Sequence, residues 1–300
     1  MHAIGPEPTE TLLLDSDLVR VVTMTGDAEP AACASKPYRF AFHRTAIDVE
    51  TAGDSPVVGN ANFVTFDHPG RAYRRFAIGS RRDSSDWFCI DPARVRGIRE
   101  LPTHGSRAPI DADTYVLERR VMRALEDGRC MSAARIVRLL ERVANQVCRH
   151  AAAAQAARLS APARHAVHDA EVIIVSRQLD ESPSLEAIAG HVGMSRFHFC
   201  RVFRRETGYS FPGYRRSLRL RSSLELIVGS AKLIDVAVTL GFASHSHFTG
   251  AFHDEFGCTP SAMRRAGNPS PSSTSSGRLI ATALSIAATK ATKPGSRVHA

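Results

Sequence analysis

The side chains in this sequence that are best suited to binding chemistry are arginines gathered on one short stretch. Residues 195–221 contain eight Arg and a single acid, Glu206. A guanidinium stays charged, so it can bind phosphate, and it can also donate two parallel hydrogen bonds to guanine. Positive charge concentrated on one element is typical of nucleic-acid binding.

Two short helices are expected to position these arginines. Ser184 predicts the start of the first helix, because its hydroxyl can accept a hydrogen bond from a first-turn N–H. Gly193 favours a left-handed turn after that helix, and Ser195 is expected to cap the second helix. The second helix then has an apolar inward face and an Arg-bearing outward face. The inward residues are Phe199, Val202 and Phe203, and the outward residues are Arg196, Phe197, Cys200, Arg201 and Arg204.

The same pattern returns about 49 residues later in the chain. Setting Ser244 on Ser195 brings a second predicted helix, residues 244–256, into register with the first. The matched pairs are Phe248 with Phe199, Phe252 with Phe203, and Gly257 with Gly208. This repetition predicts two copies of one supersecondary unit, the helix-turn-helix.

Residues from about 165 to 265 resemble the DNA-binding domain of AraC/XylS-family transcription regulators. Three stretches carry the resemblance: GMSRFHFCRVFRRETG, FPGYRRSLRLRSSLELI and LGFASHSHFTGAFHDEFGCTPSAMRR. It covers about a third of the chain. The resemblance implies an all-α domain of seven helices, here residues 163–267. Its two recognition helices would enter successive major-groove segments of double-stranded DNA, about one helical turn apart.

The resemblance assigns DNA contacts to outward residues of the two recognition helices. The base-reading candidates are Phe197, Cys200 and Arg201 in the first helix, and His245, Ser246 and Thr249 in the second. Phosphate contacts are assigned to Arg196, Arg204, Arg205 and Arg215. Arg201 can bind guanine bidentately, and Phe197 can touch a thymine methyl group. The alternatives are a solvated surface charge for Arg201 and a passive surface residue for Cys200.

The second recognition helix departs from the first in its charge. Gly250 stands where Arg201 stands in the first unit, and Asp254 stands where Arg205 stands. Acidic residues weaken the attraction to phosphate. We therefore expect the first unit to dominate affinity and specificity. The connecting helix, which Ser210 and Pro212 begin, is expected to expose Arg215, Arg216, Arg219 and Arg221.

Residues 1–110 predict a different architecture. After a loose start at 1–10 come short runs that alternate apolar with polar residues, as half-buried antiparallel strands do. The runs are 18–24, 38–45, 61–67, 72–78 and 86–90. They predict a small β-barrel or sandwich, and the resemblance implies that it is a cupin-like sensing or dimerisation domain. The fold class as a whole is therefore α+β.

A small-molecule effector pocket is one interpretation of the aromatic residues in these strands. The candidates are Phe40, Phe42, His43 and Phe63, and the alternative for the aromatic rings is an ordinary hydrophobic core. His43, His68 and His104 each stand alone, whereas a cupin metal centre needs several His and a carboxylate. We therefore expect no metal and no cofactor.

Residues 111–162 predict helices and the linker to the DNA-binding domain. Apolar residues recur at three- and four-residue steps through 131–159, which indicates a long amphipathic helix. Packing within the chain and pairing in a homodimer are both open for this helix. Ser160 and Pro162 are expected to mark the linker. The tail, 268–300, is rich in Ser, Thr, Ala and Pro and is predicted to be disordered.

Composition favours a cytoplasmic DNA-binding protein. The net charge is +9, and the six Cys are scattered without zinc-ligand spacing, as reduced thiols would be. We find neither a signal peptide nor an apolar run long enough to cross a membrane. These features fit a protein without catalytic activity that binds DNA.

The sequence thus predicts a sequence-specific transcription regulator that senses a small molecule. Activators are common in the family that it resembles, which favours activation, with RNA polymerase as a further partner. One alternative is an architectural DNA binder that senses nothing. Another is a DNA-repair methyltransferase that is also a regulator, which would need an activated Cys.

Overall fold

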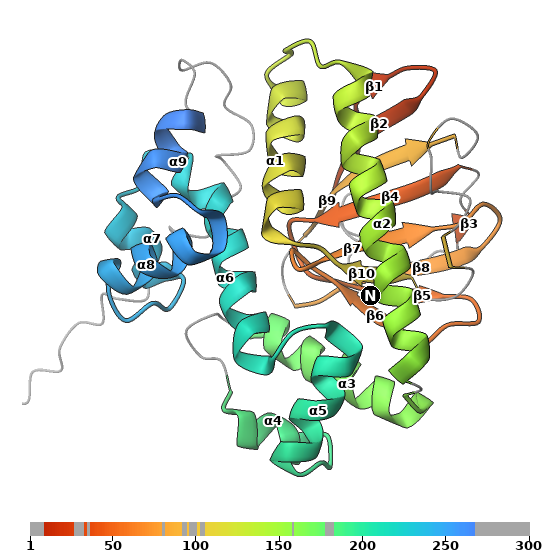
Figure 1. Cartoon of the computed structure of the whole chain (residues 1–300), viewed down its shortest axis with the longest axis vertical. Coiled ribbons are helices and arrows are strands. Elements are labelled where there is room, and N and C mark those ends of the chain that lie inside the picture. The colour runs from red at the N-terminus through yellow and green to blue at the C-terminus, as the bar shows by residue number, and fades with distance from the viewer. Residues whose placement is uncertain are drawn as a thin grey trace, which may run out of the picture.

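The computed structural model of the protein describes residues 9–26, 33–34, 37–79, 82–91, 95, 101–102, 106–157, 159–177 and 183–267. The predicted disordered tail, 268–300, and most of the predicted loose start lie outside these residues. A β-rich N-terminal region is followed by helices that continue to residue 267 (Figure 1). The α+β fold class predicted from the sequence is confirmed.

The strands form two antiparallel sheets. The larger sheet contains, in spatial order, β1 (Thr9–Asp15), β2 (Val19–Gly26), β9 (Asp83–Ile90), β4 (Tyr38–His43), β7 (Phe63–Asp67) and β10 (Arg107–Pro109). The smaller sheet contains β3 (Cys33–Ala34), β8 (Ala72–Ala77), β5 (Ile47–Thr51) and β6 (Val57–Gly59). In the described strands the sheets do not close into a barrel, so the sandwich form of the prediction is the observed one.

Several strands were not predicted from the sequence, and their patterns explain why. β1 is a mostly exposed edge strand, and its first residues, Thr9 and Glu10, were expected to be loose. β5 alternates buried Ile47 and Val49 with Asp48 and Glu50, and it follows β4 after only three residues. β6 and β10 have three residues each, too few to show a period of two.

Alternation along the larger sheet gives its two faces different chemistry. Phe40, Phe42 and Phe88 lie on the face that joins the main hydrophobic core. The opposite face carries Ala41 and Trp87, which pack with Tyr73 of the smaller sheet. The main core continues without a break into the helices that follow.

Two helices cover the apolar face of the larger sheet (Figure 1). α1 (Ala112–Glu126) begins at Asp111, whose carboxylate accepts from the Thr114 N–H, and α2 (Ala133–Ala157) is the long amphipathic helix. Residues Ile136, Leu139, Leu140 and Val143 of α2 are fully buried. This burial shows that α2 packs within the chain, and its exposed face leaves pairing in a homodimer untested.

The remaining part of the described chain is helical, as the resemblance implied. Its elements are α3 (Ala161–Ser176), α4 (Leu185–His191), α5 (Arg196–Thr207), α6 (Phe211–Ile227), α7 (Leu233–Thr239), α8 (His245–Phe256) and α9 (Pro260–Gly267). Ser160 and Pro162, expected in a linker, instead begin α3: the Ser160 side chain accepts from the Ala163 N–H. Proline is tolerated in a first turn because its missing N–H would have no helical partner.

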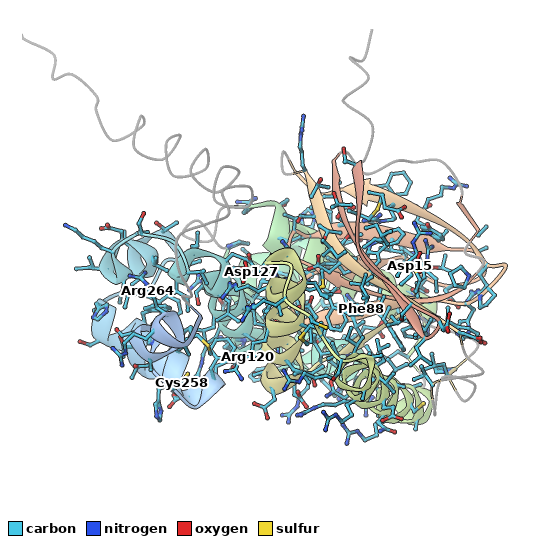
Figure 2. The ribbon with its side chains drawn as sticks, turned by 90° about the horizontal axis from the view of Figure 1, so that it is seen from above. Asp15, Phe88, Arg120, Asp127, Cys258 and Arg264 are labelled. Carbon is cyan, nitrogen blue, oxygen red and sulfur yellow. The ribbon has the colours of Figure 1, made fainter. Side chains whose placement is uncertain are left out.

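The long helix α6 joins the two helix-turn-helix units, and it also contacts the N-terminal region (Figure 1). Figure 2 shows α1, marked by Arg120 and Asp127, between the sheets and the C-terminal helices marked by Cys258 and Arg264. The contacts of α6 with the N-terminal region correct one prediction. Arg221, expected to be exposed, is only 1% exposed, because it donates to the carbonyl oxygens of Ala61 and Ile110.

Candidate nucleic-acid interface

The first helix-turn-helix unit has the local structure that its sequence predicts. The Ser184 hydroxyl accepts from the Ala187 N–H, and the Ser195 hydroxyl accepts from the His198 N–H. Gly193 adopts a φ of +68° in the turn between α4 and α5, a left-handed conformation that glycine reaches without strain. The caps and the turn together fix where α5 begins.

The inward face of α5 is held by aromatic packing. Phe199 and Phe203 are fully buried, with ring centroids 5.3 Å apart. Both rings also contact Phe211 at the start of α6, and Phe203 contacts Tyr214 one turn further along. Burying a phenylalanine side chain contributes about 1.5–3 kcal/mol. This packing fixes the rotation of α5 and therefore decides which residues face outward.

The outward face of α5 presents the predicted base-reading residues to solvent. Phe197 is 80% exposed, Arg201 is exposed, and Cys200 is half-buried. The Arg201 guanidinium donates to His198 Nδ1 at 3.0 Å. Arg196 forms an ion pair with Glu186 at 2.8 Å and lies 5.2 Å from the centre of the Phe197 ring. Neighbouring side chains therefore restrain both Arg201 and Phe197, which are predicted to contact bases.

The four predicted phosphate-binding arginines have different surroundings. Arg204 and Arg205 are exposed, and within the described residues neither side chain has a hydrogen-bond or ion-pair partner. Arg196 is held by Glu186. Arg215 is half-buried and donates to the Pro183 carbonyl oxygen at 3.2 Å. Burial, followed by the charge of Arg219, lowers the pKa of Arg215 from its ordinary value.

The second unit repeats the geometry of the first with weaker donors. The Ser244 hydroxyl accepts from the His247 N–H, and Phe248 and Phe252 are buried. Its turn glycine, Gly241, has a φ of +69°. The predicted readers His245 and Ser246 are exposed, and Thr249 is half-buried. Gly250 leaves the position that matches Arg201 without a side chain.

The acids at the end of α8 have structural partners on α6. Asp254 forms an ion pair with Arg216 at 3.4 Å, and Glu255 accepts from the Ser217 hydroxyl at 2.9 Å. Glu255 also lies 3.6 Å from Arg221. These carboxylates join the second recognition helix to the connecting helix, which is a role that the sequence comparison of the two units did not reveal.

The predicted effector residues occupy two different environments. Phe40, Phe42 and Phe63 belong to the main hydrophobic core, and Phe63 contacts the rings of Tyr209 and Tyr214 in the DNA-binding domain. His43 is fully buried and its Nε2 lies 2.8 Å from the Thr65 hydroxyl. Burial, with the charge of Arg75, lowers the pKa of His43 to about 3, so the ring is neutral at pH 7. The three phenylalanines thus face the main core and His43 faces Thr65, and an effector role for these four residues stays a prediction.

Contacts that the sequence did not indicate join the N-terminal region to the DNA-binding domain. Arg107 forms a two-point ion pair with Glu171 of α3, at 2.7 and 3.0 Å. The Asn60 amide donates to the Tyr214 hydroxyl at 2.7 Å. The local sequence offers no signal for these pairs, because their members are 64 and 154 residues apart.

A second cluster of charges lies where the larger sheet, α1 and α6 meet. Asp86 is fully buried and binds Arg44 at 2.8 Å and Arg119 at 2.6 Å. Burial raises the pKa of Asp86, but the two arginines lower it more, so the net shift is downward. Arg119 also pairs with Glu225 of α6 at 2.8 Å. This cluster connects the interior of the sheet directly to the connecting helix.

The described residues contain no group of three or more His, Cys, Asp or Glu side chains able to hold a metal ion. Among the described cysteines, Cys89, Cys130, Cys148, Cys200 and Cys258 are free thiols. Burial raises the pKa of the Cys89 thiol, which is opposite to the change that activates a nucleophile. Among the described helices, none is both long and apolar enough to cross a membrane.

Residues 188–266 match the family described as "Helix-turn-helix domain". The right origin-binding protein of Escherichia coli K12 is 33% identical over 96 residues, which are 32% of this chain and 33% of that protein. The chain thus spans about a third of the length of this relative. The Transposon Tn10 TetD protein of E. coli is 32% identical over 92 residues, which are 30% of this chain and 67% of TetD.

Solved structures are also similar. One is a transcriptional regulator with an AraC-type DNA-binding domain from Chromobacterium violaceum. It is 25% identical with a TM-score of 0.33, over 37% of this chain and 100% of that one. ToxT from Vibrio cholerae is 11% identical with a TM-score of 0.33, over 83% of this chain and 98% of that one. The chain covers 67% of TetD, and residues 188–266, which match the helix-turn-helix family, include most of both helix-turn-helix units. The chain therefore belongs to the AraC/XylS family of transcription regulators.

Proposed function

We propose that this regulator activates transcription by reading two successive major-groove segments of a specific operator. The observation that carries the proposal is the face of α5, where exposed Phe197 and Arg201 stand opposite a fully buried aromatic face. A reading helix needs this division, because its inward side must fix the orientation of its outward side. Arg201 can select guanine, at about 1–3 kcal/mol of discrimination.

The two units contribute unequally in this proposal. α5 offers a restrained arginine at the reading position and two exposed arginines for phosphate, Arg204 and Arg205, whose side chains have no partner in the described part of the chain. α8 offers histidine, serine and threonine at its reading positions, and its terminal acids are bound to α6. α5 therefore supplies most of the affinity and specificity, and α8 extends the site by about one helical turn of DNA.

Selection of bound DNA from a random pool by the full chain tests this proposal. We expect two half-elements about one turn apart, with a guanine preference that Arg201→Ala removes at one position. His198→Ala should relax the same position, because the ring that accepts from Arg201 is lost. Arg120→Ala is the matched control, since Arg120 is an exposed arginine on α1. Salt-sensitive binding without an enriched motif would favour the architectural alternative.

The N-terminal region is proposed to sense a small molecule and pass the signal through α3 and α6. Three observations support this role: Phe63 contacts Tyr214, Arg107 binds Glu171, and Arg119 binds Glu225. A change within the sheets that moved these residues would move the DNA-binding helices. The test is operator affinity of the full chain across a panel of small metabolites, and affinity that no metabolite changes would count against sensing.

The protein acts by binding in the cytoplasm, without catalysis, and it recruits RNA polymerase to the promoter. The exposed face of α2 is the surface offered for a homodimer. Sedimentation of the full chain with and without operator DNA distinguishes one bound copy from two. Transcription in vitro with purified polymerase distinguishes activation from repression.

A further inference from the structure

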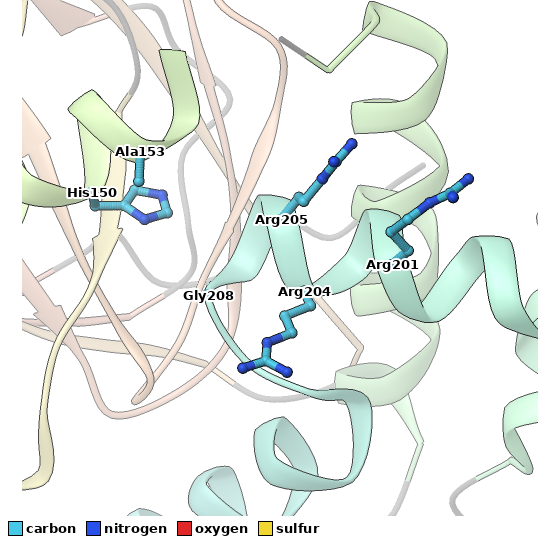
Figure 3. Close-up of a pocket in the computed structure, with 6 residues that line it drawn as sticks. All are labelled: His150, Ala153, Arg201, Arg204, Arg205 and Gly208. Carbon is cyan, nitrogen blue, oxygen red and sulfur yellow. The ribbon is translucent and has the colours of Figure 1, made fainter. Parts of the chain in front are cut away.

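A surface cavity of about 430 Å³, open to solvent, lies between α2 and α5. Its lining residues are His150 and Ala153 of α2, Arg201, Arg204 and Arg205 of α5, and Gly208 at the end of α5 (Figure 3). The volume falls within the range of about 300–1,000 Å³ that small-molecule sites occupy. The two walls come from separate parts of the chain, so a bound molecule would contact both.

The cavity has positive charge that its own walls do not balance. Three of its six lining residues are arginines and none is a carboxylate. Within the described residues, Arg204 and Arg205 have no ion-pair partner. Burial and the charge of Arg107 lower the pKa of His150 to about 4, so this ring is neutral at pH 7. The arginines alone therefore set the charge of the cavity.

A ligand in this cavity would be bound by arginine side chains of α5 that rotate toward it. Figure 3 shows the His150 ring directed toward α5, Arg204 extending to one side of that helix, and Arg201 and Arg205 extending to the other side, away from His150. Arginine side chains rotate readily, and a guanidinium binds carboxylate and phosphate groups through paired hydrogen bonds. The neutral His150 ring adds a polar contact from the opposite wall.

We propose that this cavity binds a small organic oxyanion, a phosphorylated or polycarboxylate metabolite, with Arg204 and Arg205 as its principal ligands. Such an anion bridges α2 and α5 and neutralises arginines that also serve DNA. This consequence rests on the proposed function, because Arg201 and Arg204 are needed for base and phosphate contacts there. Anion and operator therefore compete for the same helix.

The first test uses citrate as the polycarboxylate probe and the full chain without DNA. Calorimetry at constant ionic strength, with chloride as the reference anion, should show one citrate site per chain. Arg205→Ala should weaken citrate binding at least tenfold, and Arg120→Ala should leave it unchanged. Both side chains are exposed, so neither variant should unfold, and circular dichroism checks this. Binding no stronger than that of chloride, or unchanged in Arg205→Ala, would overturn the proposal.

The second test separates a free anion from the DNA backbone as the source of the oxyanion. Citrate should raise the apparent Kd of wild-type protein for its selected operator at constant ionic strength, and raise it much less for Arg205→Ala. If citrate has no effect but Arg205→Ala lowers the salt dependence of DNA binding, the cavity holds a DNA phosphate and the metabolite site is refuted. Citrate binding that depends on Arg205, in a protein that selects no DNA motif, would support the site and refute the proposed function.

Discussion

Replacement of Arg221 by methionine tests how strongly the connecting helix is tied to the rest of the molecule. The Arg221 side chain is almost completely buried, yet it carries a full charge. Its guanidinium donates to the Ala61 carbonyl at 2.9 Å and to the Ile110 carbonyl at 2.8 Å. Methionine fills much of the same volume without any donor. The Ala61 carbonyl oxygen would then lose the donor that it has in Arg221, and the Ile110 carbonyl oxygen would keep only the Tyr209 hydroxyl, at 3.0 Å.

The expected cost follows from these two contacts. Each buried acceptor that loses its partner costs about 1–3 kcal/mol, and hydrogen bonds from charged donors lie at the upper end. Removing one member of a buried charged contact typically costs about 3–5 kcal/mol. Glu255, 3.6 Å from the guanidinium, would also lose a positive neighbour. We expect Arg221→Met to lower the free energy of unfolding by about 3–5 kcal/mol.

Urea unfolding of the full chain, followed by circular dichroism, measures this difference. Arg216→Met is the matched control on the same helix: its ion pair with Asp254 is 3.4 Å long and its side chain is 48% exposed. An exposed pair contributes about 0–1 kcal/mol, so the control should change little. If the free energy of unfolding of Arg221→Met lies within about 1 kcal/mol of the wild-type value, Arg221 does not hold α6 to the N-terminal region as we infer.

Two further predictions concern a pH effect and a pair of glycines. Burial lowers the pKa of His168, but hydrogen bonds, chiefly to Asp48, raise it above its ordinary value overall. The stability that the His168–Asp48 ion pair contributes is present below about pH 6.5 and is lost as pH rises through the raised pKa of His168. Asp48→Asn should therefore lower Tm more at pH 6 than at pH 9, and equal losses would contradict the ion pair. Gly208 and Gly257 end the two recognition helices with φ of +78° and +69°. Alanine should cost about 1–2 kcal/mol at either, and more at Gly208, where its Cβ would lie 3.3 Å from Pro109; equal Tm losses would refute the extra cost.

The DNA-binding half was predictable because its information is local. Ser184, Ser195 and Ser244 accept first-turn hydrogen bonds as expected, and Gly193 takes the left-handed turn. Apolar residues at helical spacing predicted which faces are buried, and the repeat aligned the two units. Helix caps, turns and amphipathic faces each involve residues within a few positions of one another.

The N-terminal half was predictable only in outline. Five longer strands were indicated by their alternation, whereas short or exposed strands such as β6, β10 and β1 were not. Strand pairing joins distant residues, as when Arg107 of β10 pairs with Thr65 of β7. Alternation in the sequence indicates that a strand has two different faces, but it does not indicate which face packs against a helix and which packs against another sheet.

The sequence by itself determined the family, the two recognition helices and the residues on their outward faces. Only the tertiary structure decided that Arg221 is buried, that Glu255 is a structural partner of α6, and that α2 faces the arginines of α5 across a cavity. The physical reason is sequence separation. Local hydrogen bonds and helical periodicity are written in neighbouring residues, whereas the partner of a long side chain depends on how distant elements pack.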